Sequence, residues 1–262
     1  MADRDVNTLP LPSTVRGRRG PPIVLVHGFG GERAGWDTLA VALAPARRVI
    51  AFDLPGHGEA AAWTPTPDAA AAARAIIASL AQMGIDRASF VGHSLGGAVA
   101  ALVGLMRPDL AERLVLLAPG GFGPAMNARL LRRYAEAQDE ATLRLTLETF
   151  LAPTAALPDD FLAAQVRARK DPGLRRSLAA IVTAITRGDG QGTLPLDALA
   201  AAPFPTSLIW GLEDMVLPVR QAIEAPAGIA RHLLPGVGHM PHLEAPDLVR
   251  DIILRTLVGR TG

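Results

Sequence analysis

Cysteine is absent from the 262-residue sequence, and lysine is almost absent. Without cysteine, the chain forms no disulfide bond, thiolate zinc site or iron–sulfur cluster, and it has no cysteine nucleophile. Lys170 is the single lysine among 26 basic residues. The absence of cysteine therefore excludes disulfide-stapled folds and cysteine-dependent enzymes.

The sequence also lacks a charge excess and a long apolar run. It has 26 basic and 25 acidic residues, so the formal net charge is +1. This balance gives no bulk electrostatic reason to bind nucleic acid or an anionic membrane. The apolar stretches fall well short of the ~20 residues that span a bilayer, and the N-terminus has no secretory apolar segment. We expect a cytoplasmic protein with no nucleic-acid or membrane partner.

Short apolar runs bounded by turn residues recur along a chain that is 49% hydrophobic. They predict strands buried on both faces and lie within 23–26, 47–56, 87–94, 113–121, 206–214 and 230–239. Helical patterns separate them, for example the stripe of Trp36, Leu39 and Leu43. The first twenty residues predict an arm or one weak edge strand. This alternation indicates an α/β fold with a mostly parallel central sheet flanked by helices.

The alternation stops between residues 122 and 203. That stretch carries four consecutive helical patterns, at 127–139, 140–151, 158–170 and 172–187, then a loop at 187–193, and no strand pattern. The simplest organisation is a core formed by 1–121 and 204–262, with a helical cap inserted at 122–203.

The strongest chemical signal is the segment Gly92-His93-Ser94-Leu95-Gly96, which follows a strand pattern and opens a helix pattern. This is the context of a nucleophile elbow, a sharp turn that lifts the serine hydroxyl clear of the sheet. The two glycines let strand and helix approach closely, and the helix N-terminus supplies positive potential. The segment predicts Ser94 as the nucleophile and the N–H of Leu95 as an oxyanion donor.

A serine nucleophile needs a base, and in hydrolases with this elbow the acid and then the histidine follow along the chain. His239 lies just past the last strand pattern and is preferred to His242 and to His232, which lies inside the pattern. Asp214 ends the preceding strand pattern, with Glu213 as its rival. A buried carboxylate fixes the imidazole tautomer. We therefore predict Asp214 and His239 as acid and base.

The loop His27-Gly28-Phe29-Gly30-Gly31 follows the first strong strand pattern. In this position it predicts the second oxyanion donor, the N–H of Phe29, with Gly28 allowing the sharp turn. His27 is interpreted as structural, its ring bonding the neighbouring backbone.

Candidate substrate-binding residues are Gly28 and His93 beside the predicted oxyanion hole and Met240 after the predicted base. Arg167 is a fourth, in a basic patch at 167–170 that is either a solvated helix face or a carboxylate-binding site. The six histidines lack metal-ligand spacing, and the phosphate-loop and dinucleotide patterns are missing. We expect neither a metal nor a cofactor.

The motifs VLVHGFGG, DLPGHG, FVGHSLGG, LIWGLED and PGVGHMPHLEAP occur in an order and spacing that resembles the α/β-hydrolase superfamily. The resemblance implies the α/β-hydrolase fold, a triad of Ser94, Asp214 and His239, and Phe29 and Leu95 as oxyanion donors.

The segment LLAPGGFGPAMNARLLRRY is similar to the hydrolase-like C-terminal domain of acetoin dehydrogenase E2 subunits. The sequence has no lipoyl domain with a modified lysine, since Lys170 lies in the predicted cap, and it lacks the H-x-x-x-D-G motif of E2 acyltransferases. We therefore expect no lipoyl acetyl transfer. The chain is more weakly similar to meta-cleavage-product C–C hydrolases, which carry tryptophan where Met240 stands.

Three functions follow from these patterns. The first is a serine hydrolase that cleaves small or medium carboxylic esters through an acyl-enzyme on Ser94. The alternative is a C–C bond hydrolase of meta-cleavage-product type, which cleaves a ketone substrate and uses basic cap residues to grip its carboxylate. The second alternative is a non-catalytic binding module associated with an acetoin dehydrogenase-like complex. All three triad candidates are present, which disfavours the non-catalytic module, whereas both kinds of hydrolysis would use the same triad. The oligomeric state stays open.

Overall fold

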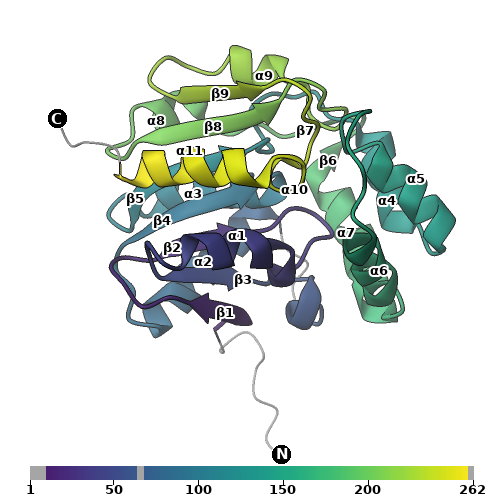
Figure 1. The fold of residues 1–262 in the computed structure, drawn as a ribbon, viewed down its shortest axis with the longest axis horizontal. Coiled ribbons are helices and arrows are strands. Elements are labelled where there is room, and N and C mark those ends of the chain that lie inside the picture. Colours follow the sequence, from purple (N-terminus) through teal and green to yellow (C-terminus); the bar gives the residue numbers. More distant parts are fainter. Residues whose placement is uncertain (1–9, 64–67, 259–262) are drawn as a thin grey trace, which may run out of the picture.

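A seven-stranded sheet forms the centre of the part of the chain that the computed structural model describes, residues 10–63 and 68–258 (Figure 1). In sheet order its strands are β1 (Ser13–Arg16), β3 (Val49–Phe52), β2 (Ile23–Val26), β4 (Ala88–His93), β5 (Ala111–Leu117), β8 (Thr206–Gly211) and β9 (Ala230–Leu234). β1 pairs antiparallel with β3, and the other strands of this sheet pair in parallel. The predicted mostly parallel sheet is confirmed, with the N-terminal strand at its edge.

Helices cover both faces of the sheet, so each strand contributes to two hydrophobic cores. Successive side chains of a strand point to opposite faces. Leu25 accordingly packs with Trp36 and the helices α1 (Asp37–Leu43) and α11 (Pro246–Val258), while Val24 packs with α2 (Ala69–Gln82) and α3 (Leu95–Met106). The predicted stripe of Trp36, Leu39 and Leu43 belongs to the first core.

The cap helices lie together at one end of the sheet (Figure 1). They are α4 (Ala128–Glu136), α5 (Glu140–Glu148), α6 (Asp159–Ala168) and α7 (Pro172–Ile185). Three of them begin after a side chain that accepts a backbone N–H of the first turn, from the caps Asn127, Asp139 and Asp171. Such caps fix where a helix starts, because they satisfy an orphan donor.

The expectation that no strand interrupts the cap is wrong at residues 186–191. A short hairpin of β6 (Thr186–Arg187) and β7 (Gly190–Gln191) stands where a loop was predicted. Gly188 takes a φ of 60° at its turn, and Gly190 forms a bridge to Ala125. Two-residue strands are too short to show a period of two, so the sequence pattern carries no sign of them.

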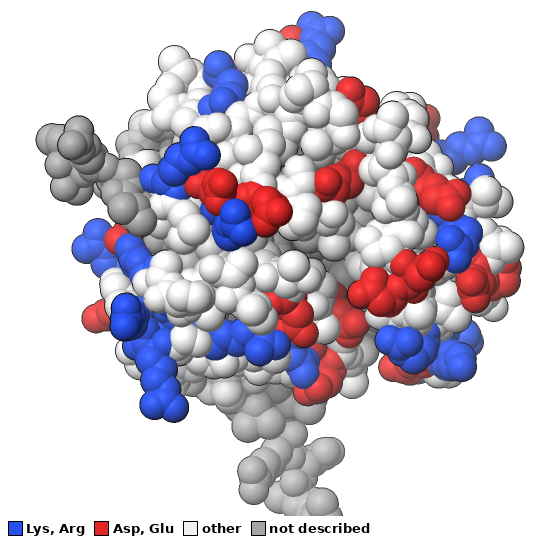
Figure 2. Space-filling model, viewed as in Figure 1, with Lys and Arg blue, Asp and Glu red and all other residues white. Residues whose placement is uncertain are grey.

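The remaining short helices connect strands around the core. They are the 3₁₀ turns at Arg33–Trp36 and Gly58–Ala60, and the helices α8 (Leu196–Ala200), α9 (Arg220–Ile223) and α10 (Pro241–Glu244). In the described residues, no helix is both long enough and apolar enough to cross a bilayer. Figure 2 shows acidic and basic side chains spread over the same face of the molecule, in keeping with the balanced charge.

Candidate active site

Ser94 lies on the turn between β4 and α3 in a strained backbone conformation. Its φ is 52° and its ψ is −117°, in a region that non-glycine residues rarely adopt. Its N–H donates to Leu117 O at 2.9 Å, and its carbonyl accepts from Gly97 and Gly120 N–H at 2.9 Å. These bonds hold the turn in place, as a nucleophile elbow requires.

The glycines around Ser94 are needed for close backbone packing. A Cβ atom on Gly92 would clash with the carbonyl oxygen of Gly96, and one on Gly96 would clash with that of Val26. On Gly28 the added atom would lie 3.2 Å from Ser94 Cβ. The oxyanion loop and the elbow therefore lie against each other.

His239 and Asp214 meet at the carboxyl ends of β9 and β8. His239 Nδ1 and Asp214 Oδ2 are 2.9 Å apart, and the two side chains are 2% and 0% exposed. Asp214 Oδ1 accepts the backbone N–H groups of Val216 at 2.8 Å and Leu217 at 2.9 Å. With Nδ1–H donated to a carboxylate, Nε2 of His239 is the nitrogen left to accept a proton.

The rivals of these two residues have other partners. Glu213 Oε2 accepts Val237 N–H at 3.0 Å, so it holds the loop that leads to His239. The ring of His242 lies against Trp36, with centroids 4.6 Å apart. His232 lies on β9, before that loop.

Glu244 anchors the histidine loop and was not singled out from the sequence. Its carboxylate accepts the N–H groups of Ala152 and Gly238 at 2.8 Å and of Met240 at 3.0 Å. The N–H of His239 in turn donates to Phe150 O at 2.7 Å. Because Phe150 and Ala152 follow α5, these bonds tie the cap to the loop.

Two buried histidines hold the predicted oxyanion loop. His57 Nε2 accepts Gly30 N–H at 3.0 Å, and His27 Nε2 accepts Leu54 N–H at 3.0 Å. His27 Nδ1 lies 2.8 Å from Gly28 O, so the ring bonds its neighbouring backbone as the sequence predicts. Burial lowers the pKa of His27 to about 4 and that of His57 to about 3. Both rings are therefore neutral at neutral pH and keep an acceptor nitrogen.

Tyr134 of α4 braces the same loop from the cap side. Its hydroxyl oxygen lies 3.1 Å from Gly30 O and 2.7 Å from Gln165 Oε1, and its ring packs edge-on against Phe29 at 5.8 Å. The guanidinium of Arg169 lies 4.5 Å above the Tyr134 ring, and Arg169 is only 3% exposed. The structure therefore buries Arg169 in a structural contact, and the basic patch predicted at 167–170 is not one solvated face.

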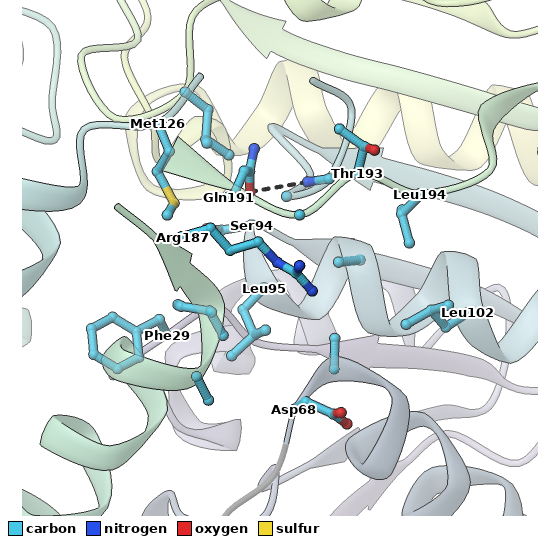
Figure 3. Close-up of a pocket in the computed structure, with 18 of the residues that line it drawn as sticks. Phe29, Asp68, Ser94, Leu95, Leu102, Met126, Arg187, Gln191, Thr193 and Leu194 are labelled. Carbon is cyan, nitrogen blue, oxygen red and sulfur yellow. Dashed lines mark hydrogen bonds between the residues drawn. The ribbon is translucent and has the colours of Figure 1, made fainter. Parts of the chain in front are cut away.

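Ser94 opens into a cavity of about 340 Å³ between the core and the cap (Figure 3). Its walls are mostly apolar and include Phe29, Leu95, Ala98, Leu102, Met126, Leu131, Leu194 and Val216. A few polar side chains, among them Gln191 and Arg187, interrupt these walls. Apolar clefts with a few placed polar groups are typical of small-molecule sites.

A family model described as "Alpha/beta hydrolase family" matches residues 23–252. The chain belongs to the alpha/beta hydrolase family. The fold and the resemblance expected from the sequence are thus confirmed.

One relative of this chain is a Pseudomonas putida protein named dihydrolipoyllysine-residue acetyltransferase component of acetoin cleaving system. It is 33% identical over 241 residues, which are 92% of this chain and 64% of that protein. The chain thus spans less than two thirds of that relative's length. A 2-hydroxymuconate semialdehyde hydrolase of a Pseudomonas species is 27% identical over 237 residues, 86% of this chain and 82% of that protein.

A solved structure of similar fold is a 2-hydroxy-6-oxo-6-phenylhexa-2,4-dienoate hydrolase from a Rhodococcus species. Its TM-score is 0.83 at 22% identity, and the match covers 94% of each chain. At this identity the likeness describes the fold alone, and a function has to be argued from the site.

The predicted substrate contacts of the hydrolase fall into different cavities. Gly28, His93 and Met240 line a second cavity of about 420 Å³, which shares Phe29 with the Ser94 cavity. His93 is bound there to the backbone, since its Nε2–H donates to His239 O at 2.8 Å.

Arg167 does not line the Ser94 cavity. It lines a third cavity, of about 410 Å³, together with Glu32 and Arg33. The arginine of the Ser94 cavity is Arg187, from the hairpin that the sequence did not predict. The direction in which Arg167 leaves its cap helix decides which cavity it lines, and sequence periodicity alone does not predict that direction.

Two further histidines near the site are also neutral. Burial lowers the pKa of His93 well below its ordinary value, and lowers that of His242 to about 3. In the described ranges, no group of three histidine, cysteine or acidic residues is placed to hold a metal ion.

Proposed function

We propose that this hydrolase cleaves small or medium carboxylic esters through an acyl-enzyme on Ser94. The observation that supports it most is the buried 2.9 Å contact between His239 Nδ1 and Asp214 Oδ2, at the same edge of the sheet as the Ser94 elbow. A buried carboxylate that orients an imidazole is part of the arrangement that acyl transfer by a serine uses on unrelated folds.

In this mechanism, Ser94 Oγ attacks the ester carbonyl carbon while His239 Nε2 takes its proton. The backbone N–H groups of Phe29 and Leu95 donate to the oxyanion of the tetrahedral intermediate. The intermediate collapses as His239 returns the proton to the leaving alcohol, which gives the acyl-enzyme. Water then attacks the acyl carbonyl, with His239 again as the base, and releases the acid and free Ser94.

The volume of the cavity supports a small or medium acyl group. Its volume of about 340 Å³ lies near the lower end of the roughly 300–1,000 Å³ of ligand pockets. In this proposal the cap, residues 122–203, roofs the acyl chain and the core supplies the chemistry.

Hydrolysis of p-nitrophenyl esters from acetate to octanoate tests the proposal, with wild type beside Ser94→Ala. We expect wild type to release p-nitrophenolate. In Ser94→Ala the rate of release should be lower by a factor of about 10⁴ or more. The chain-length profile should peak at a short or medium ester and fall at octanoate. Equal rates in the two proteins would refute the serine mechanism.

C–C bond hydrolysis is the second candidate, and the names of one relative and one structural neighbour favour it. The same Ser94, Asp214 and His239 would serve it, with a ketone carbonyl in place of an ester. Loss of the visible absorbance of a meta-ring-fission product on mixing with the enzyme would support it. If the spectrum stays unchanged while esters are still hydrolysed, C–C bond hydrolysis is excluded and ester hydrolysis stands as the proposed function.

A further inference from the structure

Arg187 brings a positive charge into the mostly apolar Ser94 cavity. Figure 3 shows its side chain extending across the cavity towards α3, where Leu95 and Leu102 form the opposite wall. Among the described residues that line this cavity, Arg187 is the only cation and Asp68 the only anion. Gly192 leaves room for the side chain, since a Cβ there would lie 3.2 Å from Arg187 Nε.

The backbone that carries Arg187 is fixed on both sides. Gln191 Oε1 accepts Gly121 N–H at 3.1 Å, which ties the hairpin to the loop after β5. At the hairpin turn, Arg132 Nη2 donates to Gly188 O at 2.6 Å. An arginine on a fixed hairpin loses less conformational freedom when it binds a ligand.

Two acidic residues, one in the hairpin that carries Arg187 and one in the lining of the cavity, have other partners. Asp189, in the hairpin turn, lies 4.0 Å from Arg132 Nη1. Asp68 accepts Ala71 N–H at 2.7 Å as the cap of α2. Within the described ranges, no carboxylate lies within ion-pairing distance of Arg187.

We propose that Arg187 binds a carboxylate at the far end of the acyl group, so that the preferred substrates are monoesters of aliphatic dicarboxylic acids. This inference rests on the proposed function and specifies its substrate class. The guanidinium fork matches the two oxygens of a carboxylate, and the methylene chain of the acyl group lies along the apolar walls. Among the described residues that line the cavity, Arg187 is the one cation available to bind the anionic end, whereas Asp68 would repel it.

Two matched esters test the inference: mono-p-nitrophenyl adipate and methyl p-nitrophenyl adipate. They share chain length and leaving group and differ in the charge at the far end. We expect wild type to cleave the anionic ester with a kcat/KM about tenfold higher than the neutral one. The preference should weaken as salt is added, because salt screens exposed charges.

Substitutions assign the preference to one residue. Arg187→Gln should bring the anionic-to-neutral ratio of kcat/KM close to one, and Arg187→Lys should retain part of it. Arg133→Gln is the matched control, because Arg133 is an exposed cap arginine that is not among the residues lining the cavity. Arg167→Gln should also keep the wild-type ratio. Loss of the preference for the anionic ester in that variant would mean that Arg167, and not Arg187, binds the carboxylate.

The outcomes separate this inference from the proposed function. A ratio of one in wild type, or an unchanged ratio in Arg187→Gln, overturns the inference while Ser94-dependent hydrolysis stands. If Ser94→Ala cleaves both esters as fast as wild type, the proposed function fails. Calorimetric titration with monomethyl adipate then still tests Arg187, and equal Kd values for wild type and Arg187→Gln would overturn its role.

Discussion

The loops that carry Ser94, Asp214 and His239 are held from two parts of the molecule, the core and the cap. In the loops, backbone groups bind buried carboxylates and imidazoles, as Val216 and Leu217 bind Asp214 and Gly30 binds His57. In the cap, the contacts to the oxyanion loop come from side chains such as Tyr134. The buried core partners Asp214 and His57 leave the loop backbone little freedom, whereas a substitution in the cap changes the Tyr134 contact and leaves those core bonds in place. We infer that the core determines the chemistry and the cap determines the choice of substrate.

The largest effect is expected at the core. Asp214→Asn keeps the size of the side chain but replaces the acceptor that fixes the Nδ1–H tautomer of His239. We expect kcat to fall about 10⁴-fold with the fold intact, since loss of the correct tautomer has this effect in serine hydrolases. Ester hydrolysis and far-ultraviolet circular dichroism measure the two quantities, and a fall of less than tenfold would place the acid elsewhere.

The second-largest effect is expected from acid, which should lower the free energy of unfolding through two buried histidines on the core side of the site. The pKa values of His27 and His57, about 4 and 3, lie below the ordinary 6.5, and the two rings lie 5.0 Å apart. The unfolded chain therefore binds more protons below pH 6.5, and the free energy of unfolding falls as the pH falls. We expect a loss of about 2 kcal/mol for each ring between pH 7.5 and 5.

Urea unfolding at the two pH values measures this loss. His57→Gln, which offers an amide oxygen to Gly30 N–H but does not titrate, should show a shallower pH dependence. Equal stability of wild type at both pH values would contradict buried neutral rings.

Loss of Glu244 tests the contact between the core and the cap. Glu244→Ala leaves the N–H groups of Ala152, Gly238 and Met240 without their acceptor. Since an unpaired buried donor costs about 1–3 kcal/mol, we expect the free energy of unfolding to fall by about 3 kcal/mol. Glu140→Ala is the control, because this exposed residue makes only a 3.8 Å ion pair with Arg144 and should change stability by less than about 0.5 kcal/mol. If the free energy of unfolding falls by a similar amount in both variants, Glu244 does not hold the histidine loop and the cap together.

The smallest expected effect concerns the cap. Tyr134→Phe removes the hydroxyl that lies within hydrogen-bond distance of Gly30 O and Gln165 Oε1 but keeps the ring against Phe29. We expect kcat for p-nitrophenyl esters to fall about tenfold, with KM within about twofold, because the oxyanion donor is less well fixed.

Thr149→Val is the control for this variant, since its hydroxyl binds only Leu145 O within α5. A change in KM alone would mean that Tyr134 shapes the acyl cavity and does not position the oxyanion loop.

The parts of the site that could be predicted from the sequence are those that local spacing decides. The five residues around Ser94 specify an elbow within one turn, and Asp214 and His239 each follow a recognisable strand pattern. The strands of the sheet were predictable for the same reason, because each is a short apolar run ended by turn residues.

The rest depends on contacts between residues far apart in the chain. Glu244 acts on backbone groups, whose position no side-chain pattern reveals. Arg167 and Arg187 both lie in the cap, but Arg187 lines the Ser94 cavity and Arg167 lines another. The direction of a helical side chain and a two-residue strand pairing decide this, and neither can be read from the sequence pattern. Tyr134 packs on Phe29 across 105 positions of sequence, a separation at which periodicity carries no information.

Covalent labelling tests whether Ser94 is the activated nucleophile. A fluorophosphonate probe should add once to the wild-type protein, and peptide mass spectrometry should place the adduct on Ser94. Ser94→Ala should stay unlabelled, and Asp214→Asn should label much more slowly. No adduct on folded wild-type protein, or an adduct on another residue, would contradict the account and favour the non-catalytic binding module.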